Sequence, residues 1–525
     1  MEHALFDCRQ DYERALKGLA HDPDNIEYKH QAVLALARSG SLAFAESEFQ
    51  RYGLDQITSD EDVLGLKARL LKDAFIQNDA PDRSHIARQS ADVYAQAFHQ
   101  TGGYYSGINA ATMTFLADGP AETIREMAQI VLDRLPEAGT VSKTDLYFIE
   151  ATRAEAFLLL SDTHSAENAI RSAWQHDPVN YIAQASTLKQ LKMICSKRAE
   201  SQDWLNAFAP PSCMHFAGHT YAMSTGSAEP HSMTGDYEAK LKAEISNTLQ
   251  KHDIAFGYGA LSAGSDILIA ECLLEEGGEL NVVLPVDVDR FKASSVTAFG
   301  GDWNARFEDC LCEARSVKVV EPHSDWPSRS LNQYAAKIAM GHAIMQADLL
   351  SSEKTQMLIL SGERGESYTD DHFTDWKRAG FETHVLDLPI ERPSENTKPS
   401  EIAQSELKIA LQTNDGSQTD FLDAMSISDA ASTALDVRKS SPRSRAIGLH
   451  SGTDDGGYAI QDIARTLAEA AVPGSLIVSE DFAALLAVEA GPAFSLHFAG
   501  RVDAGPDGER AVYSLGRTGD SFTSL

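Results

Sequence analysis

The chain has 525 residues, which is too long for one ordinary hydrophobic core, and this length predicts roughly three domains. Hydrophobic residues make up 43% of the chain and charged residues 23%, the balance of a soluble globular protein. A formal net charge of −32 argues against nucleic acid and anionic membrane as partners, because both would be repelled.

The chain contains no targeting or membrane-spanning pattern that we can identify. No run reaches about 18 apolar residues, and the first residues, MEHALFDCRQDYERALKG, are polar and amphipathic. We therefore expect a cytoplasmic protein whose cysteines are reduced packing residues, with no metal and no cofactor. A metal or disulfide is the lesser alternative, since Cys310-Leu-Cys312 lacks a second pair at metal-site spacing. The six cysteines are Cys8, Cys195, Cys213, Cys272, Cys310 and Cys312.

Residues 1–209 read almost entirely as helix. Ile26–Ser39 and Leu42–Tyr52 form a predicted helix pair, and Ala154–Pro178 carries alanines where two helices must approach closely. That segment ends in Asp177-Pro178, which echoes Asp22-Pro23. The pattern predicts tetratricopeptide-like helical hairpins, which bury their apolar faces by stacking on neighbouring hairpins.

A glycine-rich signature, Thr101-Gly-Gly-Tyr-Tyr-Ser-Gly-Ile-Asn-Ala-Ala-Thr112, interrupts these helices. It resembles the signature of the TRAFs-binding region of apoptosis-signal-regulating kinases and of many bacterial proteins, and the flanking helices agree over most of residues 30–210. The resemblance implies a scaffold on which a protein partner docks, with Tyr104 and Tyr105 as a contact surface. The alternative is that the tyrosines and the asparagine pack between repeats.

Pro210-Pro211 marks a boundary, and strands and helices alternate beyond it up to about residue 390. This alternation predicts a parallel, doubly wound sheet whose ligands lie at the carboxyl ends of the strands. The predicted strands are 214–219, 280–284, 317–320, 357–360 and 384–388, and the predicted helices are 237–251, 267–275, 302–314, 331–350 and 371–379.

Phe256–Pro285 is the most informative stretch of this region. A predicted loop containing Gly257, Gly259 and Gly264 precedes a helix, and small residues there let backbone N–H groups approach an anion. The loop is therefore a candidate phosphate cradle. An equally weighted alternative is a tight connection whose glycines serve only packing.

Three loops should converge at the carboxyl edge of this sheet: Gly218-His219, Gly259–Asp266, and Ser361–Gly365 with Thr369. Arg364 is placed to pair with a phosphate. The plainer interpretations are that Arg364 is a solvated loop residue and that His219 is only a turn residue. The candidate ligand-binding residues are Gly218, His219, Gly257, Gly259, Ser262, Gly264, Ser265, Glu363, Arg364 and Thr369.

Residues 211–390 resemble the SLOG superfamily of Rossmann-like nucleotide-binding domains, through GALSAGSD, a helix bearing Glu271, the strand LNVVLP, and the later Gly-Glu-Arg-Gly with Thr369 and Trp376. The resemblance implies a bound nucleotide or nucleotide-derived signal, and some relatives hydrolyse N-glycosidic bonds. Hydrolysis needs a carboxylate near the ribose, and Asp266 and Glu271 are the candidates. Asp266 is the better helix cap, whereas Glu271 is expected to point at the site. Because the loop GERGESYTDDH departs from the PGGxGTxxE motif of the hydrolases, binding is favoured over turnover.

Residues 391–419 are predicted as a linker that includes a hairpin, and residues 420–525 as an α+β domain. The pieces RAIGLHSG, IQDIARTLAEAA, PGSLIVSEDFAALL and AVYSL resemble the second half of a class III nucleotidyl cyclase. Cyclase chemistry needs two metal-binding carboxylates, and only Asp420 is a candidate remnant. Gln461 and Arg465 align with the family's transition-state Asn and Arg, so the Asn is replaced. The resemblance therefore implies a catalytically inactive dimerisation or docking module.

The sequence thus predicts a three-part signalling protein. Its helical scaffold (1–209) precedes a nucleotide-binding α/β domain (210–390) and, after the linker, a cyclase-like domain (420–525). The expected partners are a nucleotide-derived small molecule, a protein docked on the helical repeats, and a second copy of the chain in a homodimer. Two alternatives remain: a nucleotide N-glycosidase using Glu271, and, less favoured, an active adenylate or guanylate cyclase.

Overall fold

The computed structural model describes residues 8–77, 83–136, 141–223, 232–233, 235–321, 329–360, 368–387, 407–416, 419–422, 425–440, 445–453, 460–503 and 508–518. The chain divides into two compact units. The first comprises Met1–Pro210, His497–Gly500 and Gly516–Leu525, and the second comprises Pro211–Leu496 and Arg501–Leu515. Among the described residues, no helix has both the length and the apolar character needed to cross a membrane.

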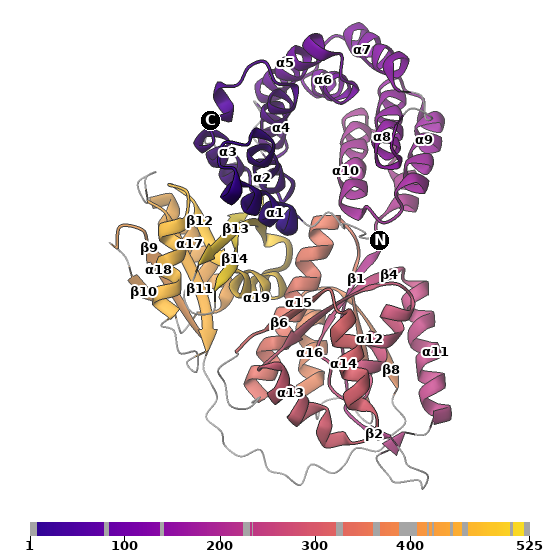
Figure 1. Ribbon diagram of the computed structural model, residues 1–525, viewed down its shortest axis with the longest axis vertical. Coiled ribbons are helices and arrows are strands. Elements are labelled where there is room, and N and C mark those ends of the chain that lie inside the picture. Colours follow the sequence, from indigo (N-terminus) through magenta and orange to yellow (C-terminus); the bar gives the residue numbers. More distant parts are fainter. Residues whose placement is uncertain are drawn as a thin grey trace. The chain divides into compact units, whose positions relative to one another are not determined.

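The first unit is built from helices that follow one another in a curved row (Figure 1). Each helix from α1 to α8 packs against the next one along the chain, and α10 packs against α8. This arrangement confirms the prediction of a helical, tetratricopeptide-like amino-terminal region. The helices are α1 (Cys8–His21), α2 (Ile26–Arg38), α3 (Leu42–Arg51), α4 (Glu61–Gln77), α5 (Ser84–Thr101), α6 (Tyr104–Leu116), α7 (Ala121–Arg134), α8 (Lys143–Leu159), α9 (Thr163–His176) and α10 (Tyr181–Arg198), with short 3-10 turns η1 (Leu54–Gln56) and η3 (Asp203–Phe208).

Two turns of this unit share the same chemistry. Asn25 and Asn180 each accept a hydrogen bond from the backbone amide three residues ahead, and so cap α2 and α10. The same two side chains donate to Asp22 and Asp177, at 3.2 and 2.9 Å. The repeated Asp-Pro-x-Asn sequence therefore encodes a repeated turn.

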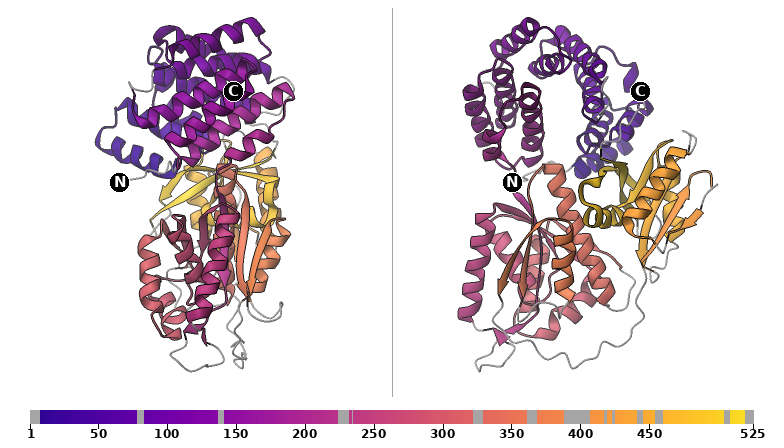
Figure 2. Two further views of the ribbon diagram at one scale, coloured as in Figure 1. Left: turned by 90° about the vertical axis from the view of Figure 1, so that its right-hand side faces the viewer. Right: turned by 180° about the vertical axis from the view of Figure 1, so that it is seen from behind.

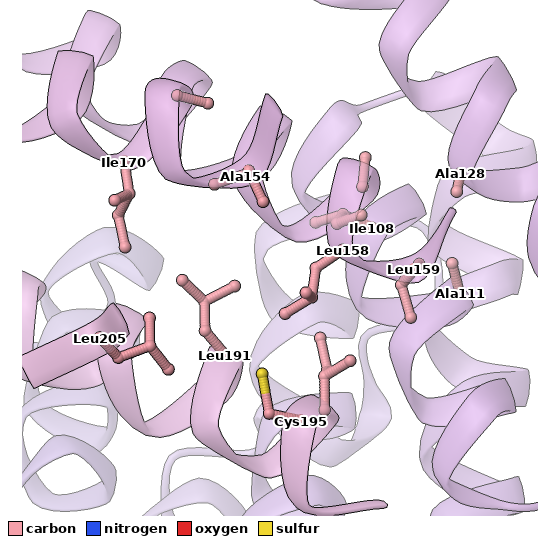
Figure 3. Packing of buried hydrophobic residues seen from close by; sticks show 14 of the residues in the cluster. Ile108, Ala111, Ala128, Ala154, Leu158, Leu159, Ile170, Leu191, Cys195 and Leu205 are labelled. Carbon is pink, nitrogen blue, oxygen red and sulfur yellow. The ribbon is translucent and has the colours of Figure 1, made fainter. Parts of the chain in front are cut away.

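The core between the later helices consists mainly of aliphatic residues and alanines, together with Cys195 and Phe208 (Figure 3). Ala154 of α8 and Ala166 of α9 are fully buried, and their small side chains let these two helices approach closely. Leu158, Leu191 and Cys195 fill the space on the side of α10. A helical hairpin alone would leave this apolar face exposed, so each hairpin depends on its neighbours.

The second unit begins with a six-stranded sheet in the order β6-β5-β4-β1-β7-β8. Every neighbouring pair is parallel, so this region has the predicted parallel α/β character. The strands are β1 (Ser212–Gly218), β4 (Ile254–Gly259), β5 (Glu279–Leu284), β6 (Ser316–Val319), β7 (Lys354–Leu360) and β8 (Glu382–Asp387), and β2 (Ala222–Met223) pairs separately with β3 (Ser232–Met233). The helices are α11 (Gly235–Lys251), α12 (Ser265–Glu275), α13 (Val288–Ser295), α14 (Trp303–Glu313), α15 (Arg329–Leu350) and α16 (Tyr368–Arg378), with η4 (Thr297–Phe299).

Helices cover both faces of this sheet (Figure 2). Neighbouring residues of a strand point to opposite faces. In β4, Gly257 faces α12, where a Cβ would lie 2.4 Å from Leu273, and Tyr258 faces α15, where its ring meets His342. Helix α12 contacts α11 and α14, whereas α15 contacts α16, so the two helical layers are distinct.

A second six-stranded sheet follows, with mixed strand directions and the order β10-β9-β11-β12-β14-β13. Its strands are β9 (Leu407–Thr413), β10 (Thr419–Phe421), β11 (Ile447–Thr453), β12 (Leu476–Ser479), β13 (Phe494–Asp503) and β14 (Glu509–Arg517), and its helices are α17 (Ile427–Ser440), α18 (Ile460–Ala470) and α19 (Glu480–Ala490), with η5 (Gly491–Ala493). The predicted linker differs from the structure at residues 407–413, which form β9 between β10 and β11. The hairpin expected there is present, because β9 and β10 pair antiparallel.

Helix α15 of the parallel sheet packs against α19 of the mixed sheet. The closest approach is at Gly341, where a Cβ would lie 2.1 Å from the backbone oxygen of Ala484. A side chain cannot be accommodated there unless one helix moves, because the opposing atom is backbone.

We predict that Gly341→Ala lowers the free energy of unfolding by about 1–3 kcal/mol, the usual cost of overpacking. Gly235→Ala is the matched control, since Gly235 also lies in a helix but has open space where the Cβ would be. Chemical denaturation of both variants measures the difference. An unchanged midpoint for Gly341→Ala would show that α15 and α19 are not packed as described.

Candidate functional site

The predicted site lies at the carboxyl edge of the parallel sheet, where β1 ends at Gly218 and its neighbour β4 ends at Gly259. From β1 the chain builds the sheet outward through β4, β5 and β6, and then returns to place β7 on the other side of β1. The junction of β1 and β7 is therefore the switch point at which open α/β sheets bind ligands. The Gly218-His219 turn leads directly from it.

The structure corrects the predicted positions of Gly257 and Gly259. Both residues lie inside strand β4 rather than in a loop. A Cβ on Gly257 would lie 2.4 Å from Leu273, and one on Gly259 would lie 2.6 Å from the carbonyl oxygen of Phe216. These two glycines therefore serve close packing, which is the alternative that the sequence left open.

The turn into α12 is also tightly closed. A Cβ on Gly218 would lie 2.3 Å from the Cβ of Ser265, so β1 and the start of α12 touch directly. Gly264 adopts a φ of +102°, a region that L-residues rarely enter, and the ring of Tyr221 packs over it. Ser265 is fully buried, which leaves little room for a phosphate between Gly218 and this helix terminus.

The buried carboxylate of Asp266 occupies the position expected for an anion. Its Oδ1 accepts a hydrogen bond of 2.8 Å from the Gly218 amide, and its Oδ2 accepts one of 3.1 Å from the Ser262 amide. Burial raises the pKa of Asp266 to about 7, although both amide hydrogen bonds favour the charged form. Asp266 thus ties the β1 turn to the β4 turn.

Two further amides of the turn also have internal acceptors. Ala263 donates to the Ser295 carbonyl at 2.9 Å, and Ser265 donates to the His219 carbonyl through its amide and, at 2.8 Å, through its hydroxyl. The amides of Ser262, Ala263 and Ser265 are therefore all engaged within the protein. In this conformation they are not presented to a ligand.

Glu271, which the sequence predicts to point at the site, turns instead toward two neighbouring helices. It forms a two-pronged ion pair with Arg306 of α14, both N–O distances being 2.6 Å, and a third contact of 2.8 Å with Lys242 of α11. Half-burial alone would raise the pKa of Glu271, but the two cations outweigh it and lower the pKa. Glu271 is thus a structural anion between helices, and the structure does not bring it together with Asp266.

The other predicted site residues lie on separate elements or outside the described residues. Glu363 and Arg364 lie outside the described residues, and Thr369 lies in α16. Asp420 lies in β10 opposite Leu411 of β9. Gln461 and Arg465 lie on α18, where Arg465 pairs with Asp462 at 2.7 Å in an exposed ion pair.

The helical unit contains a polar network that the sequence did not reveal. Lys72 of α4 donates to Asn109 of α6 at 2.9 Å and to Gln190 of α10 at 3.2 Å. Gln190 in turn donates to Glu155 of α8 at 2.8 Å, and Glu155 accepts from the hydroxyl of Thr112. We call these five residues the inter-repeat network, since they join four helices that lie far apart in the sequence.

The inter-repeat network separates the buried residues of the glycine-rich signature from its exposed ones. Asn109 is buried in it, as the packing alternative predicted, and Thr112 is buried there as well. Tyr105 remains 46% exposed, and its ring meets that of Tyr94 edge-on at 6.2 Å. Tyr105 therefore keeps part of its surface accessible to solvent while it packs against Tyr94. A sequence signal existed for the network, namely polar residues at positions that helical spacing buries.

Comparison with known proteins agrees with this helical architecture. A search of curated proteins finds no match to the chain. Residues 7–114, which span α1 to most of α6, match the model of the family described as Tetratricopeptide Repeats-Sensor.

Proposed function

We propose that this chain is a signalling sensor. In this proposal the helical repeats dock a protein partner, and the parallel-sheet domain binds a nucleotide-derived ligand at its carboxyl edge. The match of residues 7–114 to a tetratricopeptide-repeat family supports the docking role, because stacked helical hairpins offer an extended surface for partners. The mixed sheet would serve assembly, including pairing of two copies of the chain.

The observation that carries the ligand proposal is the switch point between β1 and β7, from which the Gly218-His219 turn leads. A buried carboxyl with a perturbed pKa, Asp266, lies directly behind this turn. Perturbed acids at such an edge are typical of ligand sites. Since the amides of Ser262 and Ala263 are engaged internally, the ligand would lie outside the closed turn and contact His219 and Thr220.

Binding without turnover is the function that the geometry favours. A hydrolase would need a carboxylate free to act on the ribose, whereas Glu271 is neutralised by Arg306 and Lys242. The alternative of an N-glycosidase therefore rests on the SLOG resemblance alone. Cyclase activity rests on a similar resemblance, with Asp420 as its one candidate carboxylate.

The test is to incubate the full chain with a panel of nucleotides and measure its melting temperature and the products. We expect a thermal shift with at least one nucleotide and no free base or cyclic product. Thr220→Glu adds a negative charge at an exposed position directly after the Gly218-His219 turn and should abolish the thermal shift. Asn247→Glu adds the same charge on α11 and should leave it unchanged.

The alternatives give different results in the same experiment. Release of free base that Glu271→Gln abolishes would establish the glycosidase, and a cyclic product that requires Mg²⁺ or Mn²⁺ would establish the cyclase. A shift that survives Thr220→Glu would place the ligand elsewhere. No shift with any nucleotide would overturn the ligand proposal and leave a docking scaffold.

A further inference from the structure

Two histidines and a glutamate meet at the amino end of the parallel sheet, opposite its carboxyl edge. His252 lies in the turn between α11 and β4, and Glu382 and His384 are the first and third residues of β8. One donor atom from each of the three lies within 4.8 Å of those of the other two. Glu382 and His384 share a face of β8, because strand side chains alternate.

The backbones of these residues are fixed by different elements. The carbonyl of His252 accepts a hydrogen bond of 2.9 Å from the Ser212 hydroxyl, and the carbonyl of Glu382 accepts one of 3.0 Å from the Trp376 indole. His384 is held in register opposite Met357 of β7. The three donors therefore stand on a rigid frame, which is what a metal site requires.

The side chains have the chemistry of a transition-metal site. The imidazole rings of His252 and His384 face each other with centroids 3.9 Å apart, and the Nδ1 of His384 lies 3.9 Å from Glu382. Nδ1 is thus the ring nitrogen of His384 on the side of the glutamate, whereas Nε2 is buried and has no hydrogen-bond partner among the described residues.

We propose that His252, Glu382 and His384 bind one Zn²⁺ ion. Two imidazoles and one carboxylate form an established zinc-ligand set, which leaves a fourth position for water. Imidazole ligands favour zinc over Mg²⁺ or Ca²⁺, which prefer oxygen. With bonds of about 2.0–2.2 Å, the donors would draw together to about 3.3 Å by side-chain rotation. Glu382, with its side chain 68% exposed, leaves the site open to an entering ion.

The ion would crosslink the edge strand β8 to the turn between α11 and β4. The site is independent of the proposed function, since it lies at the amino end of the strands. Sequence spacing did not reveal it, because His252 and His384 are far apart in the chain and only the sheet topology unites them.

The test uses the full, tag-free chain after chelator treatment. We expect one equivalent of Zn²⁺ to bind in competition with a chromophoric chelator and to raise the melting temperature. Co²⁺ in the same site should show the visible absorption of tetrahedral coordination, and neither Mg²⁺ nor Ca²⁺ should compete. Glu382→Gln should weaken zinc binding at least tenfold, and His252→Asn should abolish it.

His164→Gln is the matched control, because His164 is exposed in the helical unit and should not affect binding. Glu382→Gln alters an exposed side chain, so this variant is expected to fold normally. A melting temperature equal to that of the metal-free wild type would verify this. Absence of zinc binding, or zinc binding that both site variants retain, would overturn the proposal.

Discussion

Replacement of Asp266 by alanine is expected to destabilise the second unit by about 2–6 kcal/mol. The carboxylate accepts hydrogen bonds from the buried amides of Gly218 and Ser262. Its removal leaves two donors without an acceptor, each costing about 1–3 kcal/mol, in a turn where Gly218 and Ser265 are too close to admit a water. Urea denaturation measures the loss.

Glu275→Ala on the same helix is the control for removing a carboxylate. Glu275 is 64% exposed and pairs only loosely with Lys242, at 3.5 Å, so we expect a change within about 0.5 kcal/mol. If Asp266→Ala were as stable as Glu275→Ala, the amides of Gly218 and Ser262 would be reached by water when the carboxylate is removed. The cradle predicted from the sequence would then regain support.

The pH dependence of Asp266 provides a second readout of this prediction. Its pKa is raised from 3.8 in the unfolded chain to about 7 in the folded one. Between these values the folded state holds a proton that the unfolded state has released, so stability falls as pH rises. Asp266→Asn removes this titration. Between pH 5 and 8, the stability of the wild type relative to Asp266→Asn should therefore fall by about 2–3 kcal/mol.

The sequence predicted the strands that consist of apolar runs. It did not predict a strand in which close packing requires glycine in place of apolar residues. Strand β5 was evident from its run of apolar residues. Strand β4 was not, because Gly257 and Gly259 look like loop residues until Leu273 and Phe216 are seen against them. The requirement for glycine at these positions comes from tertiary contacts, which no local pattern contains.

The candidate site shows the same limit. The sequence predicted that Asp266 caps the helix, which is wrong, because α12 has no side-chain cap and Asp266 accepts hydrogen bonds from Ser262 and from Gly218 of another strand. It placed Glu271 on a helix near the site, but the direction of that side chain depends on Arg306 and Lys242 of two other helices. Residue types and local spacing were therefore predictable, whereas partners brought together by the sheet were not.

Replacement of Lys318 by methionine should have the other large effect, a loss of about 3–5 kcal/mol. Lys318 of β6 lies 2.9 Å from Asp481 and 3.1 Å from Glu480, both on α19, and these carboxylate side chains are only 9% and 15% exposed. Burial alone would raise the pKa of Asp481, but Lys318 lowers it below its usual value. Without the lysine, the two buried carboxylates repel each other, because the nearest positive charge has been removed.

Lys354→Met is the matched control, because the two lysine side chains are similarly buried, at 20% and 24% exposed. The partner of Lys354, Asp348, is 62% exposed, so water replaces the lost charge and the cost should stay within about 1 kcal/mol. Lys318→Arg should retain most of the stability. Neutralising both carboxylates in Lys318→Met/Glu480→Gln/Asp481→Asn should recover much of the loss, since the penalty comes from the unpaired charges.

The mode of unfolding distinguishes a local defect from loss of the contact between the two sheets. Lys318 belongs to the parallel sheet and its partners to the helix of the mixed sheet, so the pair contributes to their packing together with Gly341 and Ala484. We expect the wild-type second unit to unfold in one transition and Lys318→Met to unfold in two, with the mixed sheet separating first. Equal stability of Lys318→Met and Lys354→Met would instead mean that the carboxylates of α19 are solvated and that the two sheets are not joined through them.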